Sequence, residues 1–431
     1  MHTFKFSKKK FWLICIFPAL FIADILYGGM DYLGINLPVT PGIILRGLVL
    51  LLSLIMILKY YKMSDRFVLI WLVMLVAFSI PGLVTGIVKT GSLSDIQSLV
   101  KVLYGPFVIL LVVVLIRKYR IGSDEIIEYI AYSGYVLGLS LLLSQLLGIQ
   151  KATYGDYAFG STGIFYAQND LTLALGLGLF AAMFRLLYDF TLVRLVLISL
   201  SAFACLQIGT RSSLLLVLVA SMLPVILVVM GDHTKTKRLT RAKRIFRWLM
   251  ALSVSCLLLG LLSYGVAKQS ENTFQQGKLE QIQSGDLPRL YLITMGAIYL
   301  SQRDSLLNLT GEGQHSYAQG VGSIFSGSSD YEKLVEVDFI DMYGSYGLIF
   351  TSIMYSYFIF LLVAITKNFV WGSKKPIEGL IALSLGVYLG QSVVAGHALT
   401  SPIPTTLIAG YIALYLTQIK GGEQWRMNAG Q

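Results

Sequence analysis

The segment "SLVKVLYGPFVILLVVVLIRKYR" (residues 98–120) shows the feature on which the whole architecture depends. Its apolar part, 98–116, contains one charged residue, Lys101, and is long enough to cross a hydrocarbon core of about 30 Å as an α-helix. The basic cluster "RKYR" (117–120) follows it directly. Because positively charged segments stay in the cytoplasm, we expect 98–116 to be a transmembrane helix whose C-terminal end faces the cytoplasm.

Segments of this kind recur from one end of the chain to the other. Of the 431 residues, 55% are hydrophobic and 13% are charged, whereas a soluble domain carries roughly 25% charged residues. This composition predicts an all-α polytopic membrane protein with about twelve transmembrane helices. We expect nine of them in residues 1–267 and three in 340–431. The expected spans are 11–29, 39–58, 67–88, 98–116, 125–147, 170–188, 192–209, 212–230, 248–267, 340–364, 377–395 and 404–419.

The basic residues are distributed unevenly between the loops. With twelve spans, 24 of the 34 lysine and arginine residues fall on one set of alternate loops and on the chain ends. This bias places both termini in the cytoplasm, as in a multi-pass protein of the inner (cytoplasmic) membrane. The net charge of +11 therefore reflects topology and contact with anionic membrane lipids. The basic run in 235–247 is expected to be a cytoplasmic loop, so no nucleic-acid partner is expected.

One outer segment, 268–339, is too polar to span the membrane and too long for a simple connector. It contains the amphipathic stretch "LPRLYLITMGAIYL" (287–300), which could lie in the membrane interface or pack on the bundle. Its aromatic and apolar content argues against disorder. We therefore expect an extracytoplasmic loop with short amphipathic helices, and loops of this length are often functional.

Several kinds of chemistry lack their sequence signature in this chain. There is no GxxxxGK[ST], HExxH or GxSxG motif, so nothing indicates ATP hydrolysis, zinc proteolysis or serine acyl transfer. The cysteines Cys15, Cys205 and Cys256 lie in apolar runs without the spacing of a metal site or a disulfide framework. We expect no cofactor and no metal, with the acidic cluster at 336–341 as the alternative metal site.

Two arginines lie at the outer ends of expected helices. Arg211 belongs to "QIGTRSS" (207–213), where small polar residues surround a guanidinium at the start of a span. Arg289 belongs to "GDLPRLYLITMG" (285–296), where an aspartate and a proline indicate a helix start. Either one alone could be a surface arginine that reaches lipid headgroups. Together they suit a diphosphate, which needs more than one cationic donor.

A cluster of carboxylates, Glu336, Asp338 and Asp341, lies where the long loop re-enters the membrane. A carboxylate at the edge of a bilayer can have a raised pKa and act as a general base. The alternative is a solvated acidic helix start, which suits the helix dipole. The cluster is therefore a candidate catalytic site whose two interpretations the sequence leaves open.

Other polar residues are candidates of lower rank. Asn169 and Asp170 could contact a substrate, but their position before an apolar run also suits helix capping. Cations inside membrane spans often mark a functional site, whereas an isolated outer histidine is more often structural. The remaining candidates of these two kinds are Arg46, Lys101, His315 and His397.

Taken in chain order, four segments resemble the superfamily of O-antigen ligases and Wzy-type polysaccharide polymerases. "GIFYAQNDLTLAL" (163–175) is similar to a family stretch that precedes a span, and "GTRSSLL" (209–215) is similar to the motif G-[ST]-R-[GS]-x-L. "PRLYLITMGAIYL" (288–300), followed by "GEGQHSY" (311–317), resembles the R-x-x-x-W-x-x-A and G-x-G pattern. "EVDFIDMYGSYGLIF" (336–350) looks like the segment in which the ligases carry a histidine. The common order, spacing and sidedness of these short motifs support the resemblance.

The resemblance implies a GT-C-like membrane glycosyltransferase with an oligosaccharide on undecaprenyl diphosphate as its donor. By the family motifs, Arg211 and Arg289 would hold the diphosphate in an inverting, metal-independent reaction. The general base would lie at the histidine position, which Glu336 occupies here. This departure weakens the ligase interpretation, and it leaves Asp338 as the alternate base.

We therefore expect a polysaccharide polymerase that joins lipid-linked oligosaccharide repeat units, with a lipid-linked oligosaccharide also as acceptor. A chain-length regulator or a flippase would be a further partner. One alternative is an O-antigen ligase or another lipid-carrier-dependent glycosyltransferase. The other is a transporter or flippase without chemistry. Transporters often show inverted repeats, and no such repeat is evident in this sequence.

Overall fold

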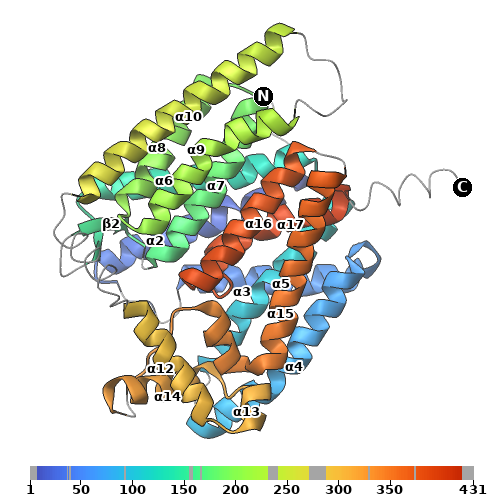
Figure 1. Cartoon of the computed structure of the whole chain (residues 1–431). Coiled ribbons are helices and arrows are strands. Elements are labelled where there is room, and N and C mark those ends of the chain that lie inside the picture. Colours follow the sequence, from blue (N-terminus) through green and yellow to red (C-terminus); the bar gives the residue numbers. More distant parts are fainter. Residues whose placement is uncertain are drawn as a thin grey trace, which may run out of the picture.

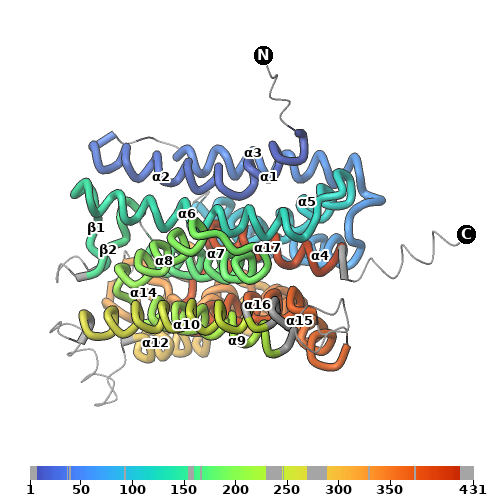
Figure 2. The backbone as a smooth tube through the Cα atoms, turned by 90° about the horizontal axis from the view of Figure 1, so that it is seen from above, coloured from blue at the N-terminus to red at the C-terminus, as the bar shows by residue number. Residues whose placement is uncertain are grey.

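The structure, a computed structural model, describes residues 7–35, 37, 40–91, 94–154, 159–165, 167–231, 241–270, 288–328, 331–372 and 375–419. It is 84% helical, which confirms the expected all-α class. The long helices lie side by side and run mainly in one direction (Figure 2). A small antiparallel hairpin of β1 (Lys151–Tyr154) and β2 (Phe159–Gly163) lies at one end of this bundle.

Within the described residues, nine helices are long and apolar enough to cross a membrane. A tenth span is formed if α1 (Lys8–Ile16) and α2 (Pro18–Tyr32), bent by 42°, count as one. The remaining two expected spans correspond to the shorter apolar helices α8 (Leu192–Gln207) and α17 (Pro402–Leu414), so the count of twelve stays a prediction. The nine helices are α3 (Pro41–Lys59), α4 (Arg66–Thr90), α5 (Ser94–Tyr119), α6 (Ser123–Leu146), α7 (Gln168–Tyr188), α9 (Arg211–Gly231), α10 (Arg241–Ser270), α15 (Asp338–Trp371) and α16 (Pro376–Val394).

Helices α5 and α7 form the centre of the bundle. In the most apolar 18-residue stretch of each helix, 83% of the residues are buried in α5 and 89% in α7. The corresponding share is 28% in α3 and 33% in α4. The exposed side chains of α3 and α4 are mainly leucine, isoleucine and valine, as expected for helices that face lipid. Polar residues at the ends of α5 and α7 therefore lie in the middle of the molecule rather than at its periphery.

Helix α15 breaks at Gly347, where φ is 82°. Glycine adopts this conformation without a steric penalty, and a Cβ here would lie 2.3 Å from the Leu309 carbonyl oxygen. The break lets α13 (Ser305–Thr310) pack closely on α15, beside α12 (Pro288–Gln302) and α14 (Gln314–Ser326) (Figure 1). These three helices lie within the segment expected to be an outer loop. They enclose a small core of their own with Leu300, Tyr317, Val321, Val335 and Val337.

Some boundaries differ from those expected from the sequence. Helix α10 begins at Arg241, so the second half of the basic run 235–247 is helical rather than part of a loop. Its first half lies outside the described residues, as does 271–287. Helix α15 begins at Asp338, two residues before the expected span. The division at 267 and 340 into membrane and outer parts stays a prediction.

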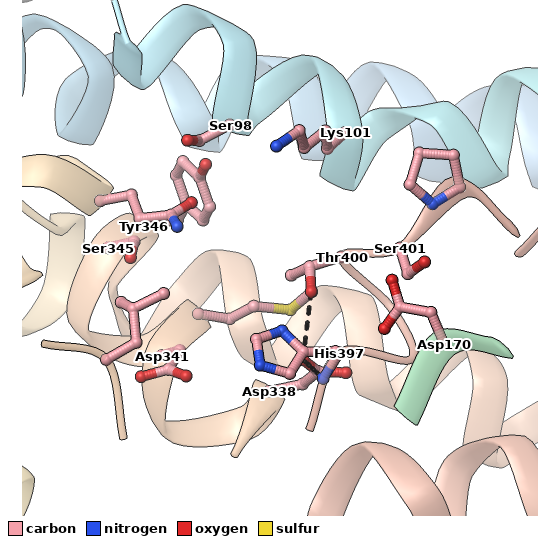
Figure 3. Close-up of a pocket in the computed structure, with 14 residues that line it drawn as sticks. Ser98, Lys101, Asp170, Asp338, Asp341, Ser345, Tyr346, His397, Thr400 and Ser401 are labelled. Carbon is pink, nitrogen blue, oxygen red and sulfur yellow. Dashed lines mark hydrogen bonds between the residues drawn. The ribbon is translucent and has the colours of Figure 1, made fainter. Parts of the chain in front are cut away.

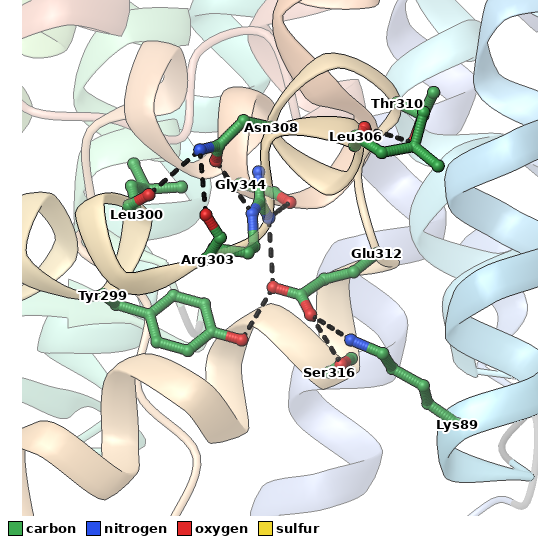
Figure 4. Close-up of polar contacts among 10 residues, drawn as sticks. All are labelled: Lys89, Tyr299, Leu300, Arg303, Leu306, Asn308, Thr310, Glu312, Ser316 and Gly344. Carbon is green, nitrogen blue, oxygen red and sulfur yellow. Dashed lines mark hydrogen bonds and ion pairs between the residues drawn. The ribbon is translucent and has the colours of Figure 1, made fainter.

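A buried carboxylate, Glu312, links the outer helices, α12 to α14, to the bundle (Figure 4). It accepts hydrogen bonds from Lys89 Nζ at 2.7 Å, the Tyr299 hydroxyl at 2.8 Å and Arg303 Nη1 at 3.0 Å. Burial alone would raise the pKa of Glu312, but the bonds from these three partners lower it overall. The ionised carboxylate thus joins α4, α12 and the turn that follows α12.

Glu312→Gln is expected to lower the free energy of unfolding by about 3–5 kcal/mol, because Arg303, 3% exposed, would lose its buried counter-charge. The pKa of Glu312 is lowered in the folded protein, so this stabilisation is complete above its ordinary pKa of 4.5. It is lost as the pH falls through the lowered pKa, so wild type and variant should converge in acid. Denaturant unfolding in detergent measures both effects. The control is Glu332→Gln, because the side chain of Glu332 is half exposed and its loss should lower the free energy of unfolding by less than about 1 kcal/mol. An equal loss in the two variants would contradict the role of Glu312.

Candidate functional site

Two adjacent cavities lie among the ends of α5, α7, α14 and α15 and the loop between α16 and α17. The inner chamber has a volume of about 250 Å³ and the more open outer chamber about 610 Å³. Four residues line both chambers: Ser98, Gln314, Leu334 and His397. The inner chamber is shown in Figure 3. Most of the candidate residues lie in or beside these two chambers.

The central helices α5 and α7 supply one wall of the inner chamber. Ser98 and Lys101 project from α5, and Asp170 projects from the first turn of α7 (Figure 3). The N-cap of α7 is Ala167, so neither Asn169 nor Asp170 occupies the capping position that the sequence suggested. Lys101 makes no ion pair or hydrogen bond with any described residue, and its ammonium group is available to a ligand.

Asp338, at the start of α15, holds the loop between α16 and α17 in place. Its carboxylate accepts hydrogen bonds from the backbone N–H groups of His397 at 2.7 Å and of Ala398 and Leu399 at 2.8 Å. The Thr400 hydroxyl donates a further bond at 3.3 Å (Figure 3). Both oxygens of this buried carboxylate are therefore occupied. Its observed role is to fix the position of His397.

Asp341, one turn further along α15, fixes the segment that carries Glu336. It accepts hydrogen bonds from the backbone N–H groups of Val335 at 2.9 Å and Glu336 at 3.0 Å. Glu336 therefore lies before the helix, with φ at 65°, and is not part of the acidic helix start that was the alternative interpretation of the cluster. A Cβ on Gly396 would lie 2.3 Å from the Glu336 carbonyl oxygen, so the segment held by Asp341 is in contact with the loop held by Asp338.

Backbone strain is concentrated at this contact. Three described non-glycine residues have a positive φ, and two of them are Glu336 and His397, at 65° and 59°. Such conformations persist where the surrounding structure enforces them, and they cluster at functional sites. Here the enforcing groups are the carboxylates of Asp338 and Asp341. Glu336 and His397 both line the outer chamber.

The side chain of Glu336 is half-exposed and has cationic neighbours. Lys333 Nζ lies 2.8 Å from Glu336 Oε1, and Arg289 Nη2 lies 3.9 Å from Oε2. Arg289 also donates a hydrogen bond to the Val394 carbonyl oxygen at 2.7 Å, which holds its guanidinium above the loop between α16 and α17. The structure thus brings Arg289 and Glu336 together, although 47 residues separate them in the chain.

His315 also lines the outer chamber. Its backbone N–H donates to Asp95 Oδ1 at 2.8 Å, and its Nδ1 lies 3.1 Å from Glu332 Oε2. Gln319 Nε2 lies 3.3 Å from its other ring nitrogen. Both ring nitrogens therefore have protein neighbours, which makes this imidazole less available to a substrate.

Arg289, although it lies beside Glu336, and three other candidates are outside the lining of both chambers. Arg211 is the first residue of α9. The hydroxyl oxygen of its neighbour Thr210 lies 3.5 Å from that of Thr172 on α7, the helix that also carries Asp170. Arg46 forms an ion pair with Asp24, which satisfies this intramembrane cation away from the cavity. Asn169 donates to the Ala395 carbonyl oxygen at 3.3 Å and supports the loop that carries His397.

Several residues of the inner chamber carry no signal that sequence analysis could use. Ser98, Gln314, Ser345 and Tyr346 are common polar residues on three helices, α5, α14 and α15, and only packing brings them together. The loop "GHALTSPIP" (396–404) did carry a signal, because a polar segment between two spans on the outer side is a candidate site. Within the described residues, no three His, Cys, Asp or Glu side chains are arranged to hold a metal ion.

A bundle of membrane-crossing helices with chambers of carboxylate, imidazole and ammonium groups at one end defines the class: a multi-pass membrane protein with a polar candidate site. Residues 5–280 match the sequence model of the family described as "O-antigen ligase like membrane protein", and the chain belongs to this family. The protein is accordingly a membrane enzyme that handles lipid-linked glycans. The match includes Arg211 and Asp170 and ends before Arg289 and Glu336. No curated protein matches the chain.

Proposed function

We propose that this protein is a polysaccharide polymerase that joins oligosaccharide repeat units carried on undecaprenyl diphosphate, at the outer face of the cytoplasmic membrane. The observation that carries the proposal is the outer chamber lined by Glu336 and His397, with Arg289 3.9 Å from the Glu336 carboxylate. A carboxylate near a cation that can bind phosphate is what a glycosyl transfer from a diphosphate donor needs. The donor supplies the energy, which agrees with the lack of a nucleotide-binding motif.

The proposed reaction is a single inverting displacement. An acceptor hydroxyl oxygen forms a bond to the anomeric carbon of the donor sugar, and the bond from that carbon to the diphosphate oxygen breaks. The proton of the hydroxyl passes to the Glu336 carboxylate, and the negative charge develops on the departing diphosphate. Arg289 and Arg211 neutralise this charge, because a guanidinium offers paired N–H donors to phosphate oxygens.

Glu336 is a better candidate for the base than its alternate, Asp338. The carboxylate of Asp338 already accepts three backbone N–H groups, and a proton on it would disrupt the loop that it holds. Glu336 is exposed to the outer chamber and can exchange its bond to Lys333 for one to a substrate. A general base must lie within hydrogen-bond reach of the proton that it accepts, and this exposure allows that approach.

The central experiment supplies the purified protein, in lipid vesicles, with lipid-linked repeat units. A ladder of glycans that grows by whole repeat units supports the polymerase. Transfer of one glycan to lipid A core without a ladder would instead support the ligase, which the description of the family favours as the second candidate. We expect the ladder to form equally in EDTA and in Mg²⁺ or Mn²⁺, because we propose no metal in the reaction. Loss of activity in EDTA with recovery in Mg²⁺ would recast the 336–341 carboxylates as ligands.

The proposed orientation places both termini in the cytoplasm and the outer helices α12–α14 outside. In a variant without native cysteines, Gln302→Cys should react with a membrane-impermeant thiol reagent on whole cells, and Lys62→Cys should react only after lysis. Both side chains are exposed, so labelling reports sidedness rather than burial. The reverse pattern would invert the topology. A chain-length regulator or a flippase remains the proposed protein partner.

A further inference from the structure

We propose that the inner chamber is a subsite for one sugar ring, the terminal residue of the acceptor glycan, and that Asp170, Tyr346 and Lys101 recognise it. This inference rests on the proposed function and adds the substrate group that the chamber selects. It follows from the unpartnered polar atoms, the charge and the size of the chamber.

Unpartnered buried polar atoms gather at the inner chamber. Asp170 Oδ1 and the Tyr346 hydroxyl are buried and have no hydrogen-bond partner among the described residues. The Ser401 hydroxyl lies beside the Asp170 carboxylate without a well-formed hydrogen bond (Figure 3). A buried polar group without a partner costs about 1–3 kcal/mol, so several around one cavity indicate a polar ligand that completes them.

Lys101 supplies a donor opposite these groups. It extends from α5 into the chamber, whereas Asp170 reaches the chamber from α7 (Figure 3). A sugar hydroxyl both donates and accepts hydrogen bonds, so one hydroxyl can donate to the carboxylate and accept from the ammonium group. A ring with several hydroxyls can satisfy Tyr346 as well. An apolar ligand could satisfy none of these atoms.

The charge of the chamber disfavours the diphosphate as its occupant. Three carboxylates, on Asp170, Asp338 and Asp341, line it, against one lysine and the imidazole of His397. Arg211 and Arg289 do not line it. A diphosphate would meet more negative than positive charge there, and like charges at close range in a partly buried site repel strongly. A neutral polyhydroxylated ring meets no such repulsion.

The size and position of the chamber select a single terminal residue. Its volume of about 250 Å³ is below the range of about 300–1,000 Å³ for pockets that hold larger ligands. The outer chamber, about 610 Å³, has room for the next part of a glycan and contains Glu336. A terminal acceptor ring in the inner chamber would direct its hydroxyl toward the outer chamber and the base, with His397 shared between the two.

The direct test is saturation-transfer NMR on the purified full-length protein, with the methyl glycosides of common hexoses, N-acetylhexosamines, 6-deoxyhexoses and hexuronic acids as probes. At least one glycoside should bind to the wild type, and Asp170→Asn and Tyr346→Phe should each raise its Kd about tenfold. The matched control is Tyr357→Phe, which removes another buried, unpartnered hydroxyl from α15, where the ring stacks on Trp71. This control should bind as the wild type does. No binding of any probe, or equal Kd values in all variants, would overturn the subsite.

The same variants separate this inference from the proposed function. In the polymerisation assay, Tyr346→Phe should raise KM for the acceptor and leave kcat nearly unchanged, because it removes binding rather than chemistry. A loss of kcat with an unchanged KM would contradict the subsite. If the wild type binds glycosides in an Asp170-dependent way but forms no glycan product, the proposed function fails and the subsite stands. If it forms glycan ladders and the substitutions change neither KM nor Kd, the subsite fails alone.

Discussion

Glu336→Gln is expected to lower the turnover of glycosyl transfer by about 10²- to 10⁴-fold and to leave donor binding nearly intact. Glutamine keeps the size of the side chain and replaces the carboxylate, which can accept the proton of the acceptor hydroxyl, by a neutral amide that is not basic enough to do so. The φ of 65° and the hydrogen bond from the Glu336 backbone to Asp341 do not involve the side chain, so the backbone should not move. The measurement is the rate of repeat-unit joining, with donor binding followed separately.

The matched control is Glu332→Gln, because Glu332 lines the same outer chamber and is also exposed. It should turn over within about threefold of the wild type, since its carboxylate pairs with His315 and plays no part in the proposed step. Asp338→Asn should affect stability first, because an amide nitrogen cannot accept the backbone N–H groups that Asp338 holds. Near-normal turnover in Glu336→Gln would move the base elsewhere. Asp338 would then be the next candidate for the general base, provided that Asp338→Asn folded normally and turned over more slowly. His315 would follow as the third candidate.

The class of the fold could be predicted from the sequence because membrane spans are local features. The run 98–116 is apolar along its whole length, and the cluster at 117–120 ends it, so α5 needs no knowledge of its neighbours. The break of α15 at Gly347 could not be predicted in the same way. It exists because the Leu309 carbonyl oxygen occupies the space where a side chain would lie, and that contact depends on tertiary packing.

The candidate site shows the same division between local and tertiary information. Residue type and position singled out Lys101, a charge within an apolar run, and Asp170, a carboxylate just before one. Their common chamber depends on the packing of α5 and α7 around α17, which no motif encodes. Glu336 and Asp338 are two residues apart, which on one helix would place their side chains about 200° apart. The hydrogen bond from the Glu336 backbone to Asp341 instead holds Glu336 before the helix. There it contacts the loop between α16 and α17, which carries His397.

Arg289→Ala and Arg211→Ala are each expected to reduce turnover by about 30- to 1000-fold, which corresponds to the loss of about 2–4 kcal/mol of transition-state stabilisation. Arg289→Lys and Arg211→Lys should also be impaired, because lysine keeps the charge and loses the planar pair of N–H donors. The control is Arg66→Ala, since Arg66 is an exposed arginine at the opposite end of the bundle and should not affect the rate. Rates of repeat-unit joining in vesicles give all five values.

The double variant tests whether the two arginines act on one group. Arg289 lies 3.9 Å from Glu336, and Arg211 begins a different helix, α9; neither arginine lines a chamber, so a common diphosphate must bridge them. If it does, the two losses should not add, because removing one contact weakens the other. Strict additivity would assign the arginines to separate groups, and Arg211 would then contact a lipid headgroup rather than the donor. Wild-type rates in both single variants would remove the diphosphate role altogether, while a loss confined to Arg289 would place the departing diphosphate beside Glu336 alone.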